Sequence, residues 1–171
     1  MPLTQTTPNA LSFRELLDYT AGETERWQQW LAKQPEAVLE VPVGEGGTAT
    51  VRGLLQHIFA VERRYADRLE GQPVSNPQVI DATNLESLFA GGRDSRQRIE
   101  SYLARVSDDD LTRRLEFQIA TGATVSASAR KVIAHTLLHG VRHWAQLATA
   151  LRQQGYRTDW QHDLLASPAL V

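Results

Sequence analysis

The stretch HTLLHGVRHWAQLATALRQQG, residues 135–155, decides the fold class of this 171-residue chain. Its apolar residues recur every three or four positions, which is the spacing of an amphipathic α-helix. We expect this helix to begin near Ser126 or Ser128 and to end before Gly155, a residue that suits a left-handed C-terminal cap. Its apolar stripe comprises Val132, Leu137, Val141, Leu147 and Leu151.

Three earlier segments carry the same helical pattern. A Ser or Thr followed three residues later by Glu forms a capping box, and this signal predicts helix starts at Ser12 and at Thr83. The segment between them stops at Gly71, and Gly91 and Gly92 weaken the middle of the third helix. We therefore predict helices over about 12–33, 49–70, 84–106 and 127–154.

Four amphipathic segments without a sustained strand pattern predict an all-α fold, a four-helix bundle built as one domain over residues 1–171. The exception lies before the last helix, where Leu115, Phe117 and Ile119 alternate with polar residues and Gly122 follows. This alternation predicts a short β-hairpin. The tail that follows, residues 156–171, contains aromatic and leucine side chains, and we expect it to fold back against the bundle.

The composition excludes several function classes. Lys and Arg number 18 against 20 acidic residues, the net charge is −2, and the basic residues form no stripe, which argues against a nucleic-acid partner. No leader segment and no apolar run long enough to span a bilayer are visible, so we expect a cytoplasmic protein without membrane contact. With no cysteine, a metal must be held by nitrogen and oxygen, and any thiol chemistry needs a separate molecule.

The histidines form the candidate site. His139 and His143 lie four residues apart, so both project from one face of the last helix and can bind one ion. His57 lies on the apolar stripe of the second helix and supplies the third ligand. His135 extends the row, but its drift around the helix places it at the rim or behind a ligand, and we expect His162 in the tail to be structural or exposed.

Two further residues are candidates for supporting roles. Glu62 follows His57 by five residues and either orients a ligand or acts as a base, or else forms a solvent-facing salt bridge with an arginine. Gln146 lies three residues after His143 and either hydrogen-bonds to that ligand or is a polar residue at the bundle end. The protease motif His-Glu-x-x-His is missing, and no helix histidine has a Glu three residues before it, so a mononuclear site is favoured.

The segments LLQHIFAVERRYADRL, residues 54–69, and 135–155 resemble the second and last helices of the DinB/YfiT-like metalloenzyme family. The resemblance implies a bundle with non-sequential helix packing, a homodimer, and one divalent ion, nickel or zinc, held by three histidines that map to His57, His139 and His143. Many members have Arg after the last ligand, where this chain has Trp144.

The resemblance also implies an activity, because the best-understood members transfer or isomerise substrates with low-molecular-weight thiols. A metal with three histidines and an open position lowers the pKa of a bound thiol or water. We therefore expect a metal-dependent transferase whose partners are a small thiol and an electrophile. Two alternatives stay open: a metal-dependent hydrolase, and a non-enzymatic dimeric scaffold protein associated with stress.

Overall fold

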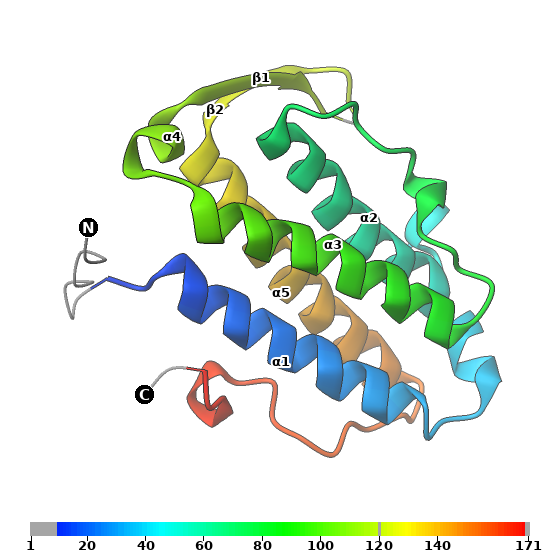
Figure 1. The fold of residues 1–171 in the computed structure, drawn as a ribbon. Coiled ribbons are helices and arrows are strands. Elements are labelled where there is room, and N and C mark those ends of the chain that lie inside the picture. The colour runs from blue at the N-terminus through cyan, green and yellow to red at the C-terminus, as the bar shows by residue number, and fades with distance from the viewer. Residues whose placement is uncertain (1–9, 120, 170–171) are drawn as a thin grey trace.

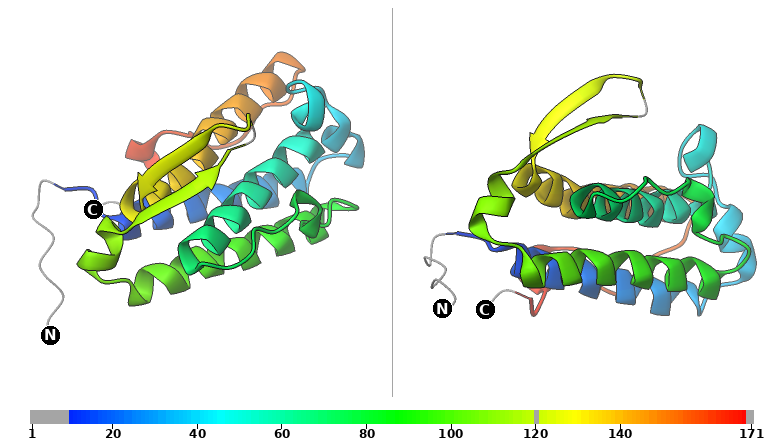
Figure 2. Two further views of the ribbon diagram at one scale, coloured as in Figure 1. Left: turned by 90° about the horizontal axis from the view of Figure 1, so that it is seen from above. Right: turned by 45° about the horizontal axis from the view of Figure 1, so that its top comes forward.

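The computed structural model describes residues 10–119 and 121–169, and its four long helices form a bundle (Figure 1). The two helices α1 and α3 form one layer, and α2 and α5 form the other (Figure 2). Each helix packs on its partner in the layer and on one helix of the opposite layer. The predicted four-helix bundle is confirmed. The long helices are α1 (Phe13–Leu31), α2 (Val51–Glu70), α3 (Leu85–Arg105) and α5 (Ala129–Gln153).

The helix starts follow the side-chain caps, with one correction. The capping box of Ser12 with Glu15 opens α1 as predicted, and the Ser128 hydroxyl caps α5. The predicted box at Thr83 is wrong, because α3 is capped by the Asn84 side chain, which accepts from the Ser87 backbone at 2.9 Å. Asn is at least as good a cap as Thr, so the helix begins one residue later.

Glycines end two helices and permit a close contact in a third. Gly71 with φ 68° caps α2, and Gly155 with φ 88° follows α5, both in the left-handed region predicted for them. Gly92 serves packing instead, because a Cβ built there would lie 2.7 Å from the ring of Phe59. The glycine that weakens α3 locally therefore lets α2 and α3 approach closely.

A two-stranded antiparallel hairpin precedes α5, as the alternation predicted. Strands β1 (Arg114–Gln118) and β2 (Thr124–Ser128) pair with Phe117 opposite Val125. The Phe117 ring lies 5.9 Å from that of Tyr65 on α2, so the hairpin leans over the α2/α5 layer (Figure 2). The short elements are α4 (Asp108–Thr112) and the 3₁₀ turns η1 (Glu36–Glu40), η2 (Gly46–Thr48), η3 (Pro77–Val79) and η4 (Leu164–Ala166).

The core consists of two apolar clusters, one toward each end of the bundle. Trp27 and Trp30 are buried in the first cluster, where the Trp27 ring stacks on that of Trp144 at 5.7 Å. The tail returns along this end, with Trp160 against Trp27 at 5.2 Å. Leu165 does not follow, since it is 95% exposed, so the expected fold-back applies only to part of the tail.

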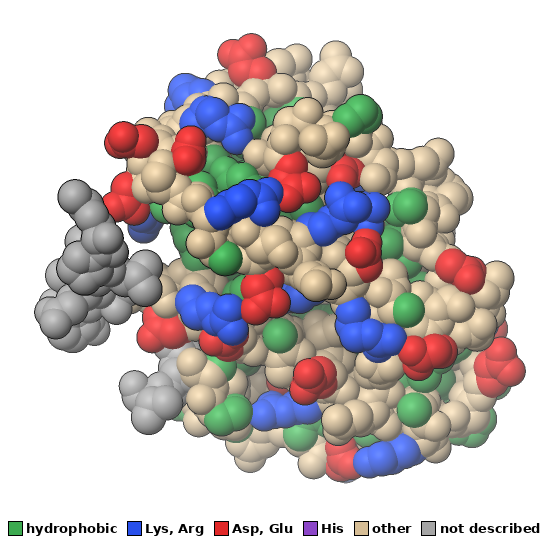
Figure 3. Space-filling view, viewed as in Figure 1, with side chains coloured by type: hydrophobic (Ala, Val, Ile, Leu, Met, Phe, Trp, Pro, Cys, Tyr) green, Lys and Arg blue, Asp and Glu red, His purple; other side chains and the backbone are tan. Residues whose placement is uncertain are grey.

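The surface agrees with the even charge pattern of the sequence. Basic and acidic side chains alternate over the face formed by α1 and α3 (Figure 3), and surface ion pairs such as Arg14–Glu100 at 2.9 Å join them. No stripe of one sign is visible on this face. Within residues 10–119 and 121–169, no helix combines the length and the apolar character needed to cross a bilayer.

Candidate metal centre

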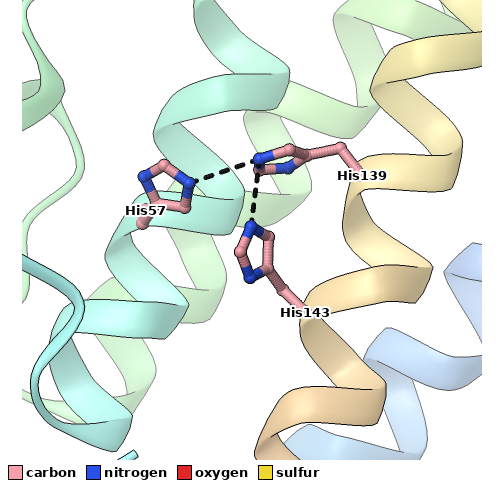
Figure 4. A group of neighbouring side chains, drawn as sticks. All are labelled: His57, His139 and His143. Atoms are coloured by element: carbon pink, nitrogen blue, oxygen red, sulfur yellow. Dashed lines mark hydrogen bonds between the residues drawn. The ribbon is translucent and has the colours of Figure 1, made fainter. Parts of the chain in front are cut away.

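Three histidine rings from two helices converge between α2 and α5 (Figure 4). His57 projects from α2, while His139 and His143 project from successive turns of α5. One nitrogen from each ring lies within 4.8 Å of the others, and all three side chains are half-buried. The structure thus brings together the three histidines expected as ligands.

The separations match those of nitrogens that share one ion. The Nε2 atom of His139 lies 3.2 Å from Nε2 of His57 and 3.1 Å from Nε2 of His143. Two nitrogens bound at about 2.05 Å with a tetrahedral angle lie roughly 3.3 Å apart. At that bond length, the observed spacings correspond to nitrogen–metal–nitrogen angles of about 100°, so a divalent transition metal fits between the rings.

Hydrogen bonds alone satisfy this cluster poorly. A neutral imidazole nitrogen carries either a hydrogen or a lone pair, never both. Nε2 of His139 therefore cannot donate to one neighbour and accept from the other, although both lie within hydrogen-bond distance. Three lone pairs directed at one cation leave no such conflict.

The environment favours the neutral form, which a metal requires, for the His57 and His139 rings. Burial, followed by the charges of neighbouring bases, lowers the pKa of His139 to about 3. Burial also lowers the pKa of His57, with His143 and Arg64 adding to the effect. A proton therefore competes weakly for these nitrogens at neutral pH.

Gln146 fixes the orientation of His143. Its amide Nε2 donates to the Val43 carbonyl at 2.9 Å, so its Oε1 faces Nδ1 of His143 at 2.9 Å. Nδ1 of His143 must then carry the hydrogen, which leaves the Nε2 lone pair free for a cation. Of the two roles considered for Gln146, the contacts are those of a residue that hydrogen-bonds to His143.

Glu62 lies away from the histidines, in the interior between the two layers. It is 1% exposed and forms a 2.5 Å ion pair with Arg96 of α3. The salt bridge considered from the sequence therefore exists, but it is buried rather than solvent-facing. Burial raises the pKa of Glu62, while Arg96 opposes that shift.

The two remaining histidines take different places. His135 is exposed on α5, with its ring 5.8 Å from that of His139 and edge-on to Tyr65 at 5.2 Å, so it lies at the rim. His162 is structural, because its Nδ1 lies 3.0 Å from a Glu23 carboxylate oxygen and anchors the tail to α1.

Sequence reasoning missed the partners of two candidate residues, Gln146 and Glu62. The Val43 carbonyl that holds Gln146 lies 103 positions away in the chain, and no local pattern marks a backbone acceptor. Arg96, the partner of Glu62, sits on α3 among other arginines whose spacing did not distinguish it. Trp144, which follows His143, lies in the core and is 2% exposed.

The model of the DinB family matches residues 3–167. The chain belongs to the DinB family. Among solved structures, this DinB-family chain is similar to YfiT from Bacillus subtilis, with a TM-score of 0.66 and 14% identity over 88% of this chain and 94% of YfiT. YfiT is described as a probable metal-dependent hydrolase with an unusual four-helix bundle topology.

At that identity the likeness to YfiT shows the shared fold alone. The search of curated proteins found no match. The chain is therefore a member of the DinB family with a histidine triad that could hold a metal.

Proposed function

We propose that this chain binds one divalent transition metal, nickel or zinc, through His57, His139 and His143, and transfers a small thiol to an electrophile. The observation that carries the proposal is the convergence of three Nε2 atoms at 3.1 and 3.2 Å around His139. When bound, such a metal acts as a Lewis acid that lowers the pKa of a thiol in an open position. The thiol comes from solution, since the chain has no cysteine.

The chain's own residues prepare the site for this chemistry. Three neutral imidazoles leave the charge of a divalent ion uncompensated, which favours an anionic partner such as a thiolate. Gln146 holds the His143 ring in one tautomer, so that ligand needs no reorientation. Glu62 is not proposed as a base, because its buried carboxylate is engaged by Arg96.

Metal binding is tested by elemental analysis of the purified protein and of the variants His57→Ala, His139→Ala and His143→Ala. We expect about one equivalent of metal in the wild type and a large loss in each variant. The matched control is His162→Ala, which removes a histidine outside the cluster. Equal metal content in all five proteins would refute the site.

The transfer reaction is tested separately, by product analysis of the metal-loaded protein with an electrophile in the presence and absence of a small thiol. A thioether product that depends on both the metal and the thiol supports the transferase. A hydrolysed product formed without thiol supports the alternative, a metal-dependent hydrolase in which water takes the place of the thiol. The description of YfiT favours testing that alternative.

A further inference from the structure

A cavity of about 340 Å³ lies beside the metal centre, between α2 and the loops that carry η2 and η3. His57 lines it, together with small and neutral residues such as Gly53, Ala60 and Gln78. Among the described residues that line it, His57 and Arg64 are the only two with ionisable side chains. The cavity therefore has a candidate metal ligand and a charged side chain in the same lining.

Arg64, like Arg68 but unlike Arg63, forms no ion pair among residues 10–119 and 121–169. Arg63 forms an ion pair with Asp94, and the Arg68 guanidinium lies over the Phe117 ring at 4.8 Å. The Nε atoms of all three arginines lack a hydrogen-bond partner, but Arg68 also donates to the backbone carbonyls of Arg64 and Gln118. Among the same described residues, the Arg64 side chain forms neither a hydrogen bond nor an ion pair. The guanidinium of Arg64 is therefore free to bind an anion that enters the cavity.

The surrounding charge has one sign. The permanently charged groups that lower the pKa of His57 and of His139 are the guanidinium groups of Arg64 and of Arg142, respectively. Glu116 of the hairpin lines the next cavity together with Arg64, but the two form no ion pair. The ion itself would add two positive charges, so the site attracts anions.

The spacing suits a small molecule with two ends. Arg64 follows His57 by seven residues, which is two helical turns on one face and about 10 Å along the axis. A group bound at the metal and a carboxylate a few bonds away span that gap when the arginine side chain leans toward it. A planar guanidinium also matches a carboxylate by two parallel hydrogen bonds.

We infer that the cavity beside His57 is the subsite for an anionic end of the substrate, and that Arg64 binds that end, so the preferred substrates carry a carboxylate or a similar oxyanion. The inference rests on the proposed metal site for the position of the reacting end. The carboxylate belongs either to the thiol or to the electrophile, and the chemistry of recognition is the same for both.

Two thiols that differ only in a carboxylate test the subsite. N-acetylcysteine and N-acetylcysteamine are titrated into cobalt-loaded protein while its visible absorption is followed. We expect the wild type to bind the carboxylate-bearing thiol roughly tenfold or more tightly, as for one charge-assisted hydrogen-bonded pair. Arg64→Gln should remove most of that preference, whereas Lys131→Gln, which removes an exposed charge on α5, should keep it.

Three outcomes would overturn the inference. In the first, the wild type binds both thiols equally. In the second, Arg64→Gln keeps the full preference for the carboxylate-bearing thiol, which would assign that preference to chelation by the metal. In the third, Arg64→Gln lowers the affinity for both thiols equally, which would assign a structural role to Arg64. Urea unfolding of each variant identifies the last case independently.

A second pair of ligands separates this inference from the proposed function. N-acetylalanine keeps the carboxylate without the sulfur, and N-ethylacetamide has neither group. If no thiol changes the cobalt spectrum, thiol activation is refuted, while Arg64-dependent binding of N-acetylalanine, followed by NMR chemical shifts, still supports the subsite. If N-acetylalanine and N-acetylcysteamine bind to the protein at the same time, the carboxylate belongs to the electrophile. If N-acetylalanine and N-ethylacetamide bind with equal affinity, the proposed anion subsite is refuted.

Discussion

Replacing Gln146 by Leu should weaken metal binding without unfolding the protein. The change keeps the side-chain volume but deletes two 2.9 Å hydrogen bonds, one with Nδ1 of His143 and one to the Val43 carbonyl. Without an acceptor at Nδ1, nothing holds the ring in the tautomer that frees Nε2. Loss of such a partner behind a ligand histidine typically lowers metal affinity about 10–100-fold, which corresponds to about 1.4–2.7 kcal/mol.

The same change has a second, separable effect on stability. Val43 is 9% exposed, so its carbonyl loses its partner in a largely buried place, and we expect the metal-free protein to lose about 1–3 kcal/mol of unfolding free energy. Affinity is measured by competition with a chromogenic chelator, and stability by urea unfolding of the metal-free protein. Gln153→Leu, at an exposed position on the last turn of α5, is the matched control.

The substitution Gln146→Glu divides the two effects. A carboxylate still accepts from His143 Nδ1, but its second oxygen faces the Val43 carbonyl and repels it. Metal affinity should stay close to that of the wild type while stability falls. Our reasoning fails if Gln146→Leu leaves the affinity within about twofold of the wild type, since Gln146 would then only tie Val43 to α5.

Three further predictions concern packing, pH and ligand linkage. Gly92→Ala should destabilise the protein by roughly 1–3 kcal/mol, because the new Cβ would lie 2.7 Å from the Phe59 ring. Gly22→Ala has open space at its Cβ and should stabilise the protein by up to about 1 kcal/mol. Urea unfolding of both variants checks the two signs. The pKa of His139 falls from its ordinary value of 6.5 to about 3 in the folded protein, so between these pH values the unfolded chain binds more protons than the folded one. The unfolding free energy should therefore decrease as the pH falls from 6.5 toward 3, by at most about 1.4 kcal/mol per pH unit and by less where solvent screens the half-buried ring. Constant stability over that window would contradict the shift. Metal at about 100 times its dissociation constant should raise the unfolding free energy by about 2.7 kcal/mol, and a chelator should reverse the resulting increase in melting temperature.

The sequence allowed the helices to be predicted because their signals are local. Apolar spacing and end signals placed four helices, and the alternation from Leu115 placed the hairpin. The start of α3 was misplaced because Thr83 and Asn84 both offer a cap and only the backbone geometry decides between them. The short helix α4 was overlooked, although Ser107 and Asp110 form a capping box there.

The candidate site could be predicted only in part. Helical spacing brings His139 and His143 together, whereas the position of His57 opposite them depends on α2 packing beside α5, which no local pattern encodes. Exposure also differed from expectation for Glu62, because the arginine that pairs with it comes from α3 across the interior. Contacts between distant segments, such as the one between Gln146 and Val43, follow from the tertiary fold and leave no local pattern in the sequence.

The location of the histidine cluster has a consequence for the chain as a polymer. His57 and His139 are 82 positions apart in the sequence. An ion held by both would therefore close the segment between them into a loop. Closing a long loop restricts the unfolded ensemble and favours the folded one, as a covalent bridge does. In a protein without cysteine, the ion would act as a removable cross-link, opened by chelation and closed again by metal.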